Sequence, residues 1–469
     1  MVKDAALRNR RMLEGPEWKG ILAFAVPIML SQLLQQLYST VDGIIVGNFV
    51  SEGALAAVGA STVVTVGINS VSFGMANGCS VAVSQFYGAG HREDMRATTA
   101  TALTLLATLG AVAMLLCVAG AGFVAAHVLD IGSERVRLDA TTYFRIFAVG
   151  FLFQFTYNSI AAILRSIGDS RAVLYFLIVS SAVNVILDLL FVAVFRWGVA
   201  GAALATVLSQ AACMVVSWIY MQRKYALFRF RAREIRPERE KLRLCLRLGV
   251  PTALQHVIVS CGNVALQRLV DSFGSTTMAA YAVGRTYDHY IAVPCTSMFQ
   301  SLTSFSGQNT GAGRYDRVKR GAYQGIAIAV VFVVILGTLI YLFAPQLSAL
   351  YGVSGETLKQ AVAYLRFIAV AYPLMAMYLP LNGIFQGSGN PLAAAISAVI
   401  ALSARVGAAY LMVYGLGMDH SSGWKSYAVG WTCALIYVTV HFFRGRWMNK
   451  SIVKPAGPAE EAGREHVSR

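Results

Sequence analysis

Residues Gly20 to Gly47 read GILAFAVPIMLSQLLQQLYSTVDGIIVG, an apolar run that contains one proline, Pro27, and one charged residue, Asp42. The run is longer than the roughly 20 residues with which an α-helix crosses a hydrocarbon core of about 30 Å, so it predicts a tilted or kinked membrane-spanning helix. A carboxylate inside a bilayer costs at least about 2.5 kcal/mol, and such groups usually mark ion or substrate pathways. Asp42 is therefore a candidate functional residue; alternatively, it reaches a nearby surface or pairs with an arginine.

The composition is that of a membrane protein. The 469 residues are 57% hydrophobic and 13% charged, whereas soluble domains carry about 25% charged residues. This argues against a soluble enzyme, and we expect no cofactor. The 39 Lys and Arg outnumber the 23 Asp and Glu, but they lie mostly in short segments between apolar runs, where the positive-inside rule explains them better than nucleic-acid binding does. The seven cysteines stand singly, without metal-ligand or disulfide spacing.

Apolar runs separated by breakers predict an all-α integral membrane protein with twelve transmembrane helices. Most Lys and Arg between the runs fall on one side, which predicts a multi-pass protein of the cytoplasmic (inner) membrane with both termini in the cytoplasm. The expected parts are a cytoplasmic tail at 1–19, an N-lobe of helices one to six at 20–221, a basic cytoplasmic linker at 222–243, a C-lobe of helices seven to twelve at 244–447 and a cytoplasmic tail at 448–469. The linker is either solvated or an amphipathic helix on anionic lipid.

The two halves of the sequence are copies of one another. Three motifs recur at a nearly constant spacing: Ala25-Val26-Pro27 as Gly249-Val250-Pro251, Gly88-Ala89-Gly90 as Gly311-Ala312-Gly313, and Gly168-Asp169 as Gly389-Asn390. A shared period over most of each half indicates duplication. Because each copy holds six spans, the two repeats have parallel topology and form two lobes. This architecture predicts alternating access, in which the lobes rock and expose a site to one side of the membrane at a time.

In this order, these features resemble the MATE (multidrug and toxic compound extrusion) transporters: a Val-Pro in the first helix, Asp42 fifteen residues later, the Gly-Ala-Gly loops and the two six-helix units. The resemblance implies a secondary antiporter that exports organic, often cationic, compounds in exchange for cations. It places the cation or proton site at Asp42 in helix one with Asn184 and Asp188 in helix five. The expected partners are small organic substrates, protons or sodium ions and membrane lipids, with the protein acting as a monomer.

The same resemblance implies weaker candidates. Tyr38, Asn158 and Thr206 would line the substrate cavity, although the residues themselves favour a satisfied polar packing role for each. Pro27 resembles the proline at which helix one bends in the family when the acid is protonated, and a proline within a span permits a kink. A static kink is the alternative.

The residues support an acid pair in the first half. Asn184 and Asp188 are four residues apart and therefore share a helix face. Counted from the outer ends of their helices, Asp42 and Asp188 lie at similar depth, so the two acids are expected to share a proton or a cation. In the second half, the repeat places Leu266 opposite Asp42 and Ala409 opposite Asp188. The C-lobe thus lacks this pair. The sodium-coupled branch of the family carries acids in helices seven and ten, whereas here helix ten has no Asp or Glu and helix seven has none before Asp271. The resemblance therefore favours protons over sodium; sodium at Asp42 and Asp188 remains the alternative, and no other metal site is expected.

Several intramembrane charges lie outside this pair. Arg268 with Asp271, and Arg285 with Asp288, are three residues apart, a spacing that allows each pair to neutralise itself, which is the alternative to a functional role. Arg405 has no local partner and is a candidate for the substrate cavity of the C-lobe. A rival function follows from these arginines, since a flippase for lipid-linked oligosaccharide would use cationic residues to hold pyrophosphate. A channel is less favoured because no filter-like segment is repeated.

Overall fold

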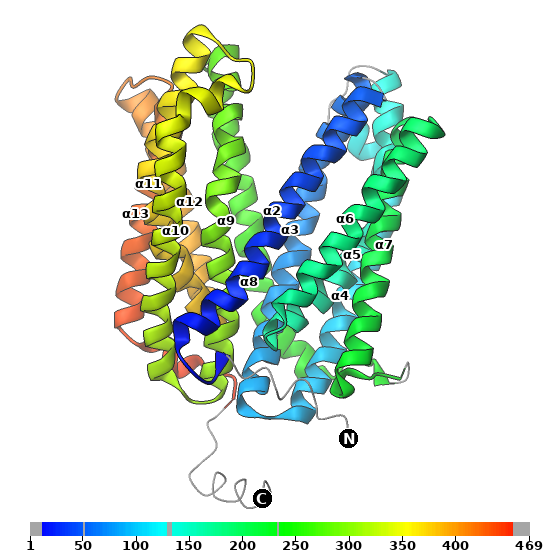
Figure 1. The fold of residues 1–469 in the computed structure, drawn as a ribbon, viewed down its shortest axis with the longest axis vertical. Coiled ribbons are helices and arrows are strands. Elements are labelled where there is room, and N and C mark those ends of the chain that lie inside the picture. The colour runs from blue at the N-terminus through cyan, green and yellow to red at the C-terminus, as the bar shows by residue number, and fades with distance from the viewer. Residues whose placement is uncertain (1–11, 50–51, 129–133, 232–233, 454–469) are drawn as a thin grey trace, which may run out of the picture. The chain divides into compact units, whose positions relative to one another are not determined.

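The structure, a computed structural model, describes residues 12–49, 52–128, 134–231 and 234–453, without the side chains of 38–49, 52–63, 127–128 and 135–136. These residues fold into helices, with no strand among them (Figure 1). The first half holds α2 (Glu17–Phe49), α3 (Glu52–Ala89), α4 (Arg92–Phe123), α5 (Glu134–Ser166), α6 (Ser170–Asp188) and α7 (Gly198–Lys224). The second half holds α8 (Arg239–Asp271), α9 (Ser275–Gly311), α10 (Tyr315–Ala349), α11 (Gly355–Gly387), α12 (Pro391–Tyr410) and α13 (Ser422–Phe443).

These helices confirm the predicted all-α membrane fold. Within the described residues, ten helices are long and apolar enough to cross a membrane by length and composition. The remaining two, α3 and α9, are 38 and 37 residues long. Helix α9 carries Arg285 and Asp288 and ends in a Ser-, Thr- and Gln-rich segment.

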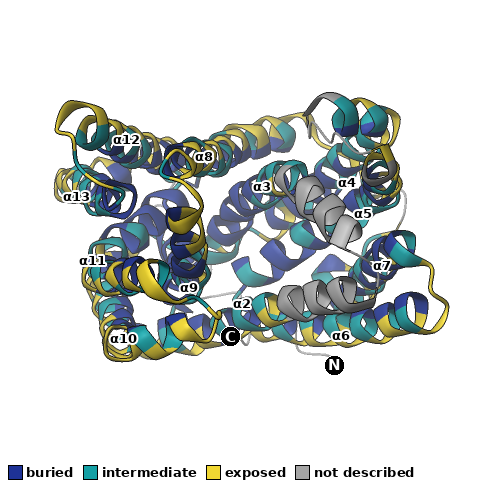
Figure 2. Cartoon of the chain, turned by 90° about the horizontal axis from the view of Figure 1, so that it is seen from above, coloured by how far each residue is buried: buried dark blue, intermediate teal, exposed yellow. Residues whose placement is uncertain are grey.

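Helix α10 has one face of mostly small buried residues and one face of large exposed apolar residues. Its buried stripe contains small residues every fourth position, whereas its exposed face is aliphatic, with Val331, Ile335 and Leu339 each about half exposed. The buried side lies close to neighbouring helices: a Cβ on Gly337 would lie 3.0 Å from the carbonyl oxygen of Ala369 on α11. Small residues towards protein and large apolar ones outwards are the pattern of a helix in lipid. Figure 2 shows the same division into buried and exposed faces on the other helices.

The contacts divide the chain into two compact units. Unit 1 is made of the described parts of 27–83 and 92–253, and unit 2 of those of 10–26, 84–91 and 254–469. Three helices therefore contribute to both units: α2 changes unit at Pro27, α3 at Ser84, and α8 just after Ala253, two residues beyond Pro251. Pro27 and Pro251 are equivalent positions of the repeat. The predicted segment boundaries at 1–19, 20–221, 222–243, 244–447 and 448–469 stay a prediction.

The duplication extends to the packing inside each unit. In unit 1, α4 packs on α5, α5 on α7 and α6 on α7; in unit 2, α10 packs on α11, α11 on α13 and α12 on α13. Each of these pairs is the repeat equivalent of the other. The similarity includes a local irregularity, because α6 continues into a π-helical turn at Leu189–Val194 and α12 into one at Leu411–Gly415.

The repeated Gly-Ala-Gly motif ends helices α3 and α9. Its second glycines, Gly90 and Gly313, have φ angles of +75° and +72°, which L-residues with a side chain rarely adopt and which glycine adopts freely. Its first glycines, Gly88 and Gly311, have backbone of the other helix end where a Cβ would lie, at Gln308 and Gln85 respectively. The motif thus serves two structural purposes, a left-handed helix end and a close approach of two backbones inside unit 2.

The basic linker shows no α-helix in the described part of 225–238; a single 3₁₀ turn covers Ala226–Phe228. Instead it is tied to the beginning of α4. Arg96 pairs with Glu234 at 2.9 Å, and Lys241 at the start of α8 pairs with Asp94 at 2.5 Å. The alternative of an amphipathic helix is therefore wrong for the described residues.

Asp169, from the repeated Gly-Asp motif, caps helix α6. Its carboxylate accepts hydrogen bonds from the backbone N–H of Ala172 at 3.3 Å, from the hydroxyls of Tyr220 and Tyr225 at 2.9 and 2.5 Å, and from Lys224 Nζ at 2.9 Å. Burial acts to raise the pKa of Asp169, but the hydrogen bonds from Tyr225 and Lys224 and the charge of Lys224 outweigh it and lower this pKa. The ionised carboxylate therefore joins the start of α6 to the end of α7.

Replacing this carboxylate tests the junction. We expect Asp169→Asn to lower the free energy of unfolding by about 1–3 kcal/mol, because the amide loses charge-assisted hydrogen bonds. Since the folded-state pKa is lowered, the contribution is present above the ordinary pKa of 3.8 and disappears as the pH falls through the folded value. Thermal unfolding of both proteins at pH 7 and at about pH 3 measures this.

Asp316→Asn is the matched control, since Asp316 is an exposed carboxylate in the first turn of α10. It should change stability by only a few tenths of a kcal/mol. Equal effects of the two substitutions at neutral pH, or an Asp169→Asn effect that persists unchanged in acid, would contradict the assigned role.

Candidate functional site

The predicted polar pair on helix α6 is buried in unit 1. Asp188, the last residue of α6, is fully buried, and Asn184 one turn earlier is 1% exposed. Neither the oxygen nor the nitrogen of the Asn184 amide has a hydrogen-bond partner among the described residues. A buried polar group without a partner costs about 1–3 kcal/mol, so this amide is a functional candidate rather than a structural one.

Thr206 on α7 lies at the same level as this pair. Helices α6 and α7 are consecutive and antiparallel, and they are joined where Ser180 donates to the backbone oxygen of Ser209 at 3.2 Å. Asn184 is one turn beyond Ser180 on α6, and Thr206 one turn before Ser209 on α7. The Thr206 hydroxyl donates to the carbonyl of Ala202 at 3.0 Å within its own helix.

The other candidates of the first half differ in what the structure describes. Asn158 on α5 donates to the hydroxyl of Ser72 on α3 at 2.9 Å and contacts Gln154 at 3.5 Å, so it bridges two helices of unit 1. Pro27 lies inside α2, and its carbonyl accepts from Ser31 at 2.7 Å. The side chains of Tyr38 and Asp42 lie outside the described residues.

The repeat equivalents of the predicted acid pair contact one another in unit 2. Leu266 on α8 and Ala409 on α12 are both fully buried in a single hydrophobic cluster with Leu269. Val406 and Val413 pack around it. Where the first half carries Asp42 and Asp188, the second half therefore has an apolar contact between the corresponding helices.

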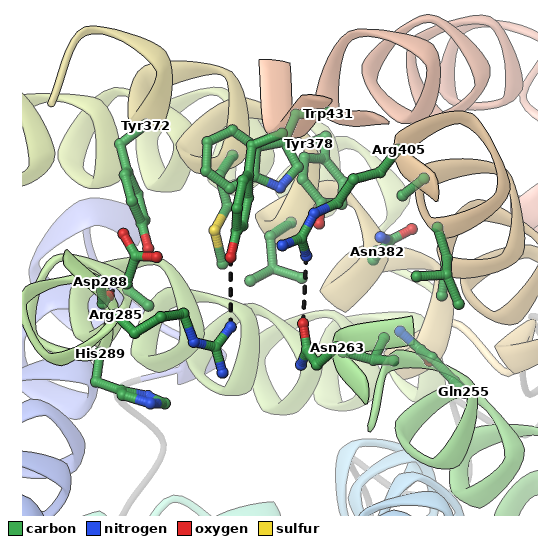
Figure 3. Close-up of a pocket in the computed structure, with 18 residues that line it drawn as sticks. Gln255, Asn263, Arg285, Asp288, His289, Tyr372, Tyr378, Asn382, Arg405 and Trp431 are labelled. Carbon is green, nitrogen blue, oxygen red and sulfur yellow. Dashed lines mark hydrogen bonds between the residues drawn. The ribbon is translucent and has the colours of Figure 1, made fainter. Parts of the chain in front are cut away.

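Unit 2 contains a cavity of about 250 Å³ between α8, α9, α11, α12 and α13 (Figure 3). Arg405, predicted to lie in a cavity of the C-lobe, lines it together with Arg285 and Asp288. Arg405 is 9% exposed, and its guanidinium lies over the ring of Tyr427 at 3.3 Å while donating to Asn263 Oδ1 at 3.2 Å. This side of the molecule is thus basic, in contrast to the acid on α6.

The spacing of Arg285 and Asp288 allows an ion pair, but the structure has none between them. No ion pair joins either residue to another described residue. Instead Asp288 accepts a hydrogen bond from the hydroxyl of Tyr364, and Arg285 donates to the hydroxyl of Tyr427 at 3.3 Å. Helix spacing brings Arg285 and Asp288 near one another, but aromatic residues from α11 and α13 supply the hydrogen bonds.

The second pair with this spacing also behaves differently. Arg268 and Asp271 are both exposed, and Asp271 accepts from Gln267 at 2.7 Å rather than from Arg268. Arg268 does not line the cavity. Sequence reasoning missed Tyr427 and Asn263 as cavity residues, because nothing in their local sequence distinguishes them from packing residues.

Comparison with known proteins agrees with this architecture. The family model MatE matches residues 27–190 and 251–411, one match in each half, each beginning at a repeated proline. The probable multidrug resistance protein YoeA of Bacillus subtilis (strain 168) is 28% identical over 446 residues, covering 93% of this chain and 96% of that protein.

Two crystal structures of MATE, one described as straight and one as bent, also match. The straight one is 26% identical with a TM-score of 0.84 and covers 93% of this chain and 97% of its own. The bent one is 25% identical with a TM-score of 0.84 and covers 93% and 96%. With a family model that spans both repeats, the chain belongs to the MatE family of multi-pass membrane transporters.

Proposed function

We propose that this protein exports organic, often cationic, compounds across the cytoplasmic membrane by alternating access, in exchange for protons held by Asp42, Asn184 and Asp188 in unit 1. Tyr38, Asn158 and Thr206 would line the adjoining substrate path. The observation that carries the proposal is the buried α6 turn, in which Asp188 is fully buried and the Asn184 amide has no hydrogen-bond partner among the described residues. Groups of this kind persist in a membrane when a transported species needs them.

The repeat supports the pairing of Asp42 with Asp188. In unit 2, the equivalent residues Leu266 and Ala409 belong to one hydrophobic cluster, so the corresponding helices meet at these positions. The other helices of the two units pack in the same pairs, and from this repeat we propose that Asp42 belongs to the same site as Asp188. Two carboxylates at short range in a low dielectric do not both ionise readily, so they hold a proton between them.

Protons are favoured over sodium as the coupling ion. The acid pair has no counterpart in unit 2, where the equivalent contact between Leu266 and Ala409 is apolar. Transport driven by a sodium gradient alone, in the experiment below, would instead assign sodium to the site at Asp42 and Asp188.

Pro27 is proposed as a hinge of α2. The helix changes from unit 2 to unit 1 at this residue, and the proline lacks the N–H that would continue the helical ladder. MATE structures described as straight and as bent both match this chain. A bend at Pro27 would link protonation of Asp42, further along the same helix, to the exchange between conformations that alternating access requires.

Transport in proteoliposomes tests the coupling. With a permanently cationic fluorophore, we expect an imposed proton gradient to drive uphill transport, and Asp42→Asn or Asp188→Asn to reduce it at least tenfold, because the uncharged amide cannot take up and release the proton. Asp139→Asn, a carboxylate at the N-terminal part of α5 outside the pair, is the control. Full activity of both pair variants would overturn the proton site, and transport under a sodium gradient alone would reassign the ion.

Asn184 offers a test that separates function from folding. Because its amide has no partner among the described residues, Asn184→Leu should leave the free energy of unfolding within about 1 kcal/mol of wild type, or raise it. Proton-driven transport should nevertheless fall. Asn309→Leu is the matched control: this buried amide donates to the carbonyls of Met12 and Phe305 and accepts from Arg317, so its replacement should cost about 3 kcal/mol. A similar loss of stability in both variants would remove the functional interpretation of Asn184.

Pro27→Ala tests the hinge. Restoring the N–H allows α2 to complete its hydrogen-bond ladder, so we expect folding to be retained and the turnover rate of proton-driven transport to fall several-fold while substrate binding is unchanged. The measurement is transport rate against equilibrium binding of the same fluorophore. Pro251→Ala, in the equivalent position of α8, shows whether both repeats need the bend; an unchanged rate for Pro27→Ala would mean that its kink is static.

A second candidate function is favoured by the basic cavity of unit 2. A flippase for lipid-linked oligosaccharide would use arginines to hold pyrophosphate, and Arg285 and Arg405 share one cavity. No transport of organic cations under either gradient, together with lipid-dependent activity, would favour this function over drug export.

A further inference from the structure

We propose that the cavity of unit 2 is a binding subsite for one oxyanion group, a carboxylate or a phosphate, held by Arg405 and Arg285. The proposal deepens the function proposed above, because it assigns the cavity to the acidic part of an amphiphilic or zwitterionic substrate. It concerns different residues from the proton site, which lies in unit 1. The cavity volume of about 250 Å³ suits a small charged group with part of its scaffold, since pockets for whole drug-sized ligands are about 300–1,000 Å³.

The buried position of Arg405 gives its positive charge a high desolvation free energy. It lies well inside the 25-residue span Pro391–Gly415 and is nine-tenths buried. Two of its three guanidinium nitrogens, Nε and Nη2, are buried and have no hydrogen-bond partner among the described residues. Taking a charge out of water costs several kcal/mol, which only excellent pairing offsets. The contacts that Arg405 does make are a hydrogen bond to Asn263 and a cation–π contact with the face of Tyr427, and its side chain lines the cavity (Figure 3).

A second guanidinium points to the same place. Tyr427 contacts both arginines: its ring lies 3.3 Å from Arg405 Cζ, and its hydroxyl accepts from Arg285 Nη1 at 3.3 Å. Both guanidinium groups therefore contact the same tyrosine side chain, Arg405 at the face of its ring and Arg285 at its hydroxyl. In Figure 3 they enter the cavity from opposite sides, Arg285 from α9 and Arg405 from α12. Like charges at this spacing repel one another, and an anion between them would relieve the repulsion.

The cavity has one carboxylate against two arginines. Asp288 accepts a hydrogen bond from the hydroxyl of Tyr364, and no arginine among the described residues forms an ion pair with it. Two guanidinium groups against one carboxylate leave an excess of positive charge. This excess argues against a metal cation or an organic cation as the occupant and favours an oxyanion, whose planar or tetrahedral oxygens match the donors of arginine.

The aromatic residues complete the subsite. Tyr372, Tyr378 and Trp431 line the cavity beside the arginines, and Trp431 packs against Tyr372 and Tyr427 with ring centroids 5.0 and 5.2 Å apart. Such faces bury the apolar scaffold next to the acidic group. The expected ligand therefore combines an oxyanion with an aromatic or aliphatic body.

Equilibrium binding without a gradient tests the subsite. The full-length protein in nanodiscs of zwitterionic phosphatidylcholine is titrated with a fluorescent carboxylate, dansyl-phenylalanine, and with its methyl ester. We expect wild type to bind the acid at least tenfold more tightly than the ester. Arg405→Gln and Arg285→Gln should each abolish that difference, whereas Arg405→Lys should restore part of it by keeping the charge without the fork.

The control is Arg268→Gln, which removes an exposed arginine of α8 that does not line the cavity. It should bind the acid and the ester as wild type does. Thermal unfolding of each variant shows that it is folded, and Arg285→Gln keeps the test decisive should Arg405→Gln fail to fold. Equal affinity of wild type for acid and ester, or the same loss in Arg268→Gln as in the cavity variants, would overturn the proposal.

Two further measurements identify the source of the oxyanion and separate a failure of the subsite from a failure of the proposed proton coupling. Nanodiscs containing phosphatidylglycerol show whether a lipid phosphate competes for the same arginines: displacement of the acid that requires Arg405 assigns the subsite to a lipid headgroup, and no displacement assigns it to a soluble carboxylate. A permanently cationic fluorophore carries no oxyanion, so its proton-driven transport reports on the function proposed above alone. If wild type binds the acid but shows no proton-driven transport of the cation, the proposed coupling is refuted and the oxyanion subsite is not.

Discussion

Inside a lipid bilayer a polar group must find its partner within the protein, because there is no water to supply one. The described backbone forms these hydrogen bonds within helices, and glycines close the ends of α3 and α9. Not every buried polar side chain has such a partner. Asn184 in unit 1 and Arg405 in unit 2 are both at least nine-tenths buried, yet both keep polar atoms without a partner among the described residues. Several other buried side chains of the described residues also have polar atoms without a partner, but Arg405 carries a charge and Asn184 lies one turn from the buried Asp188.

The two positions lie in equivalent halves that have diverged in charge. Both units pack their helices in the same pairs, so the scaffold has been conserved while its polar groups have not. Helix α6 carries Asp188 where α12 carries the buried Ala409, and α12 carries Arg405 one turn earlier. A duplicated scaffold permits this division because each half buries its own core and can change one site without disturbing the other. The result is an acidic helix in one unit and a basic cavity in the other.

Sequence patterns predicted the fold well because its main determinants are local. Apolar runs longer than a bilayer is thick, breakers between them and repeated motifs are each visible in one segment, and they led to the helices, the duplication and the family. The cavity was harder to predict. The spacing of Arg285 and Asp288 allowed an ion pair, but Tyr364 and Tyr427, from helices far away in the sequence, bond to them instead. Local spacing brings candidates within reach of each other; packing between distant helices decides which contacts form.

The missing ion pair between Arg285 and Asp288 has a consequence for transport. A ligand shifts a conformational equilibrium only by the difference in its interaction with the two states. If the two residues neutralised each other, an incoming charged group would have to break that pair, and it would gain little net stabilisation. Because Arg285 and Asp288 hydrogen-bond to tyrosines and form no ion pair with each other, the positive charges of Arg285 and Arg405 remain available to a ligand. Charges left partly unsatisfied by the fold are thus a source of differential affinity, and burial in a low dielectric makes that difference large.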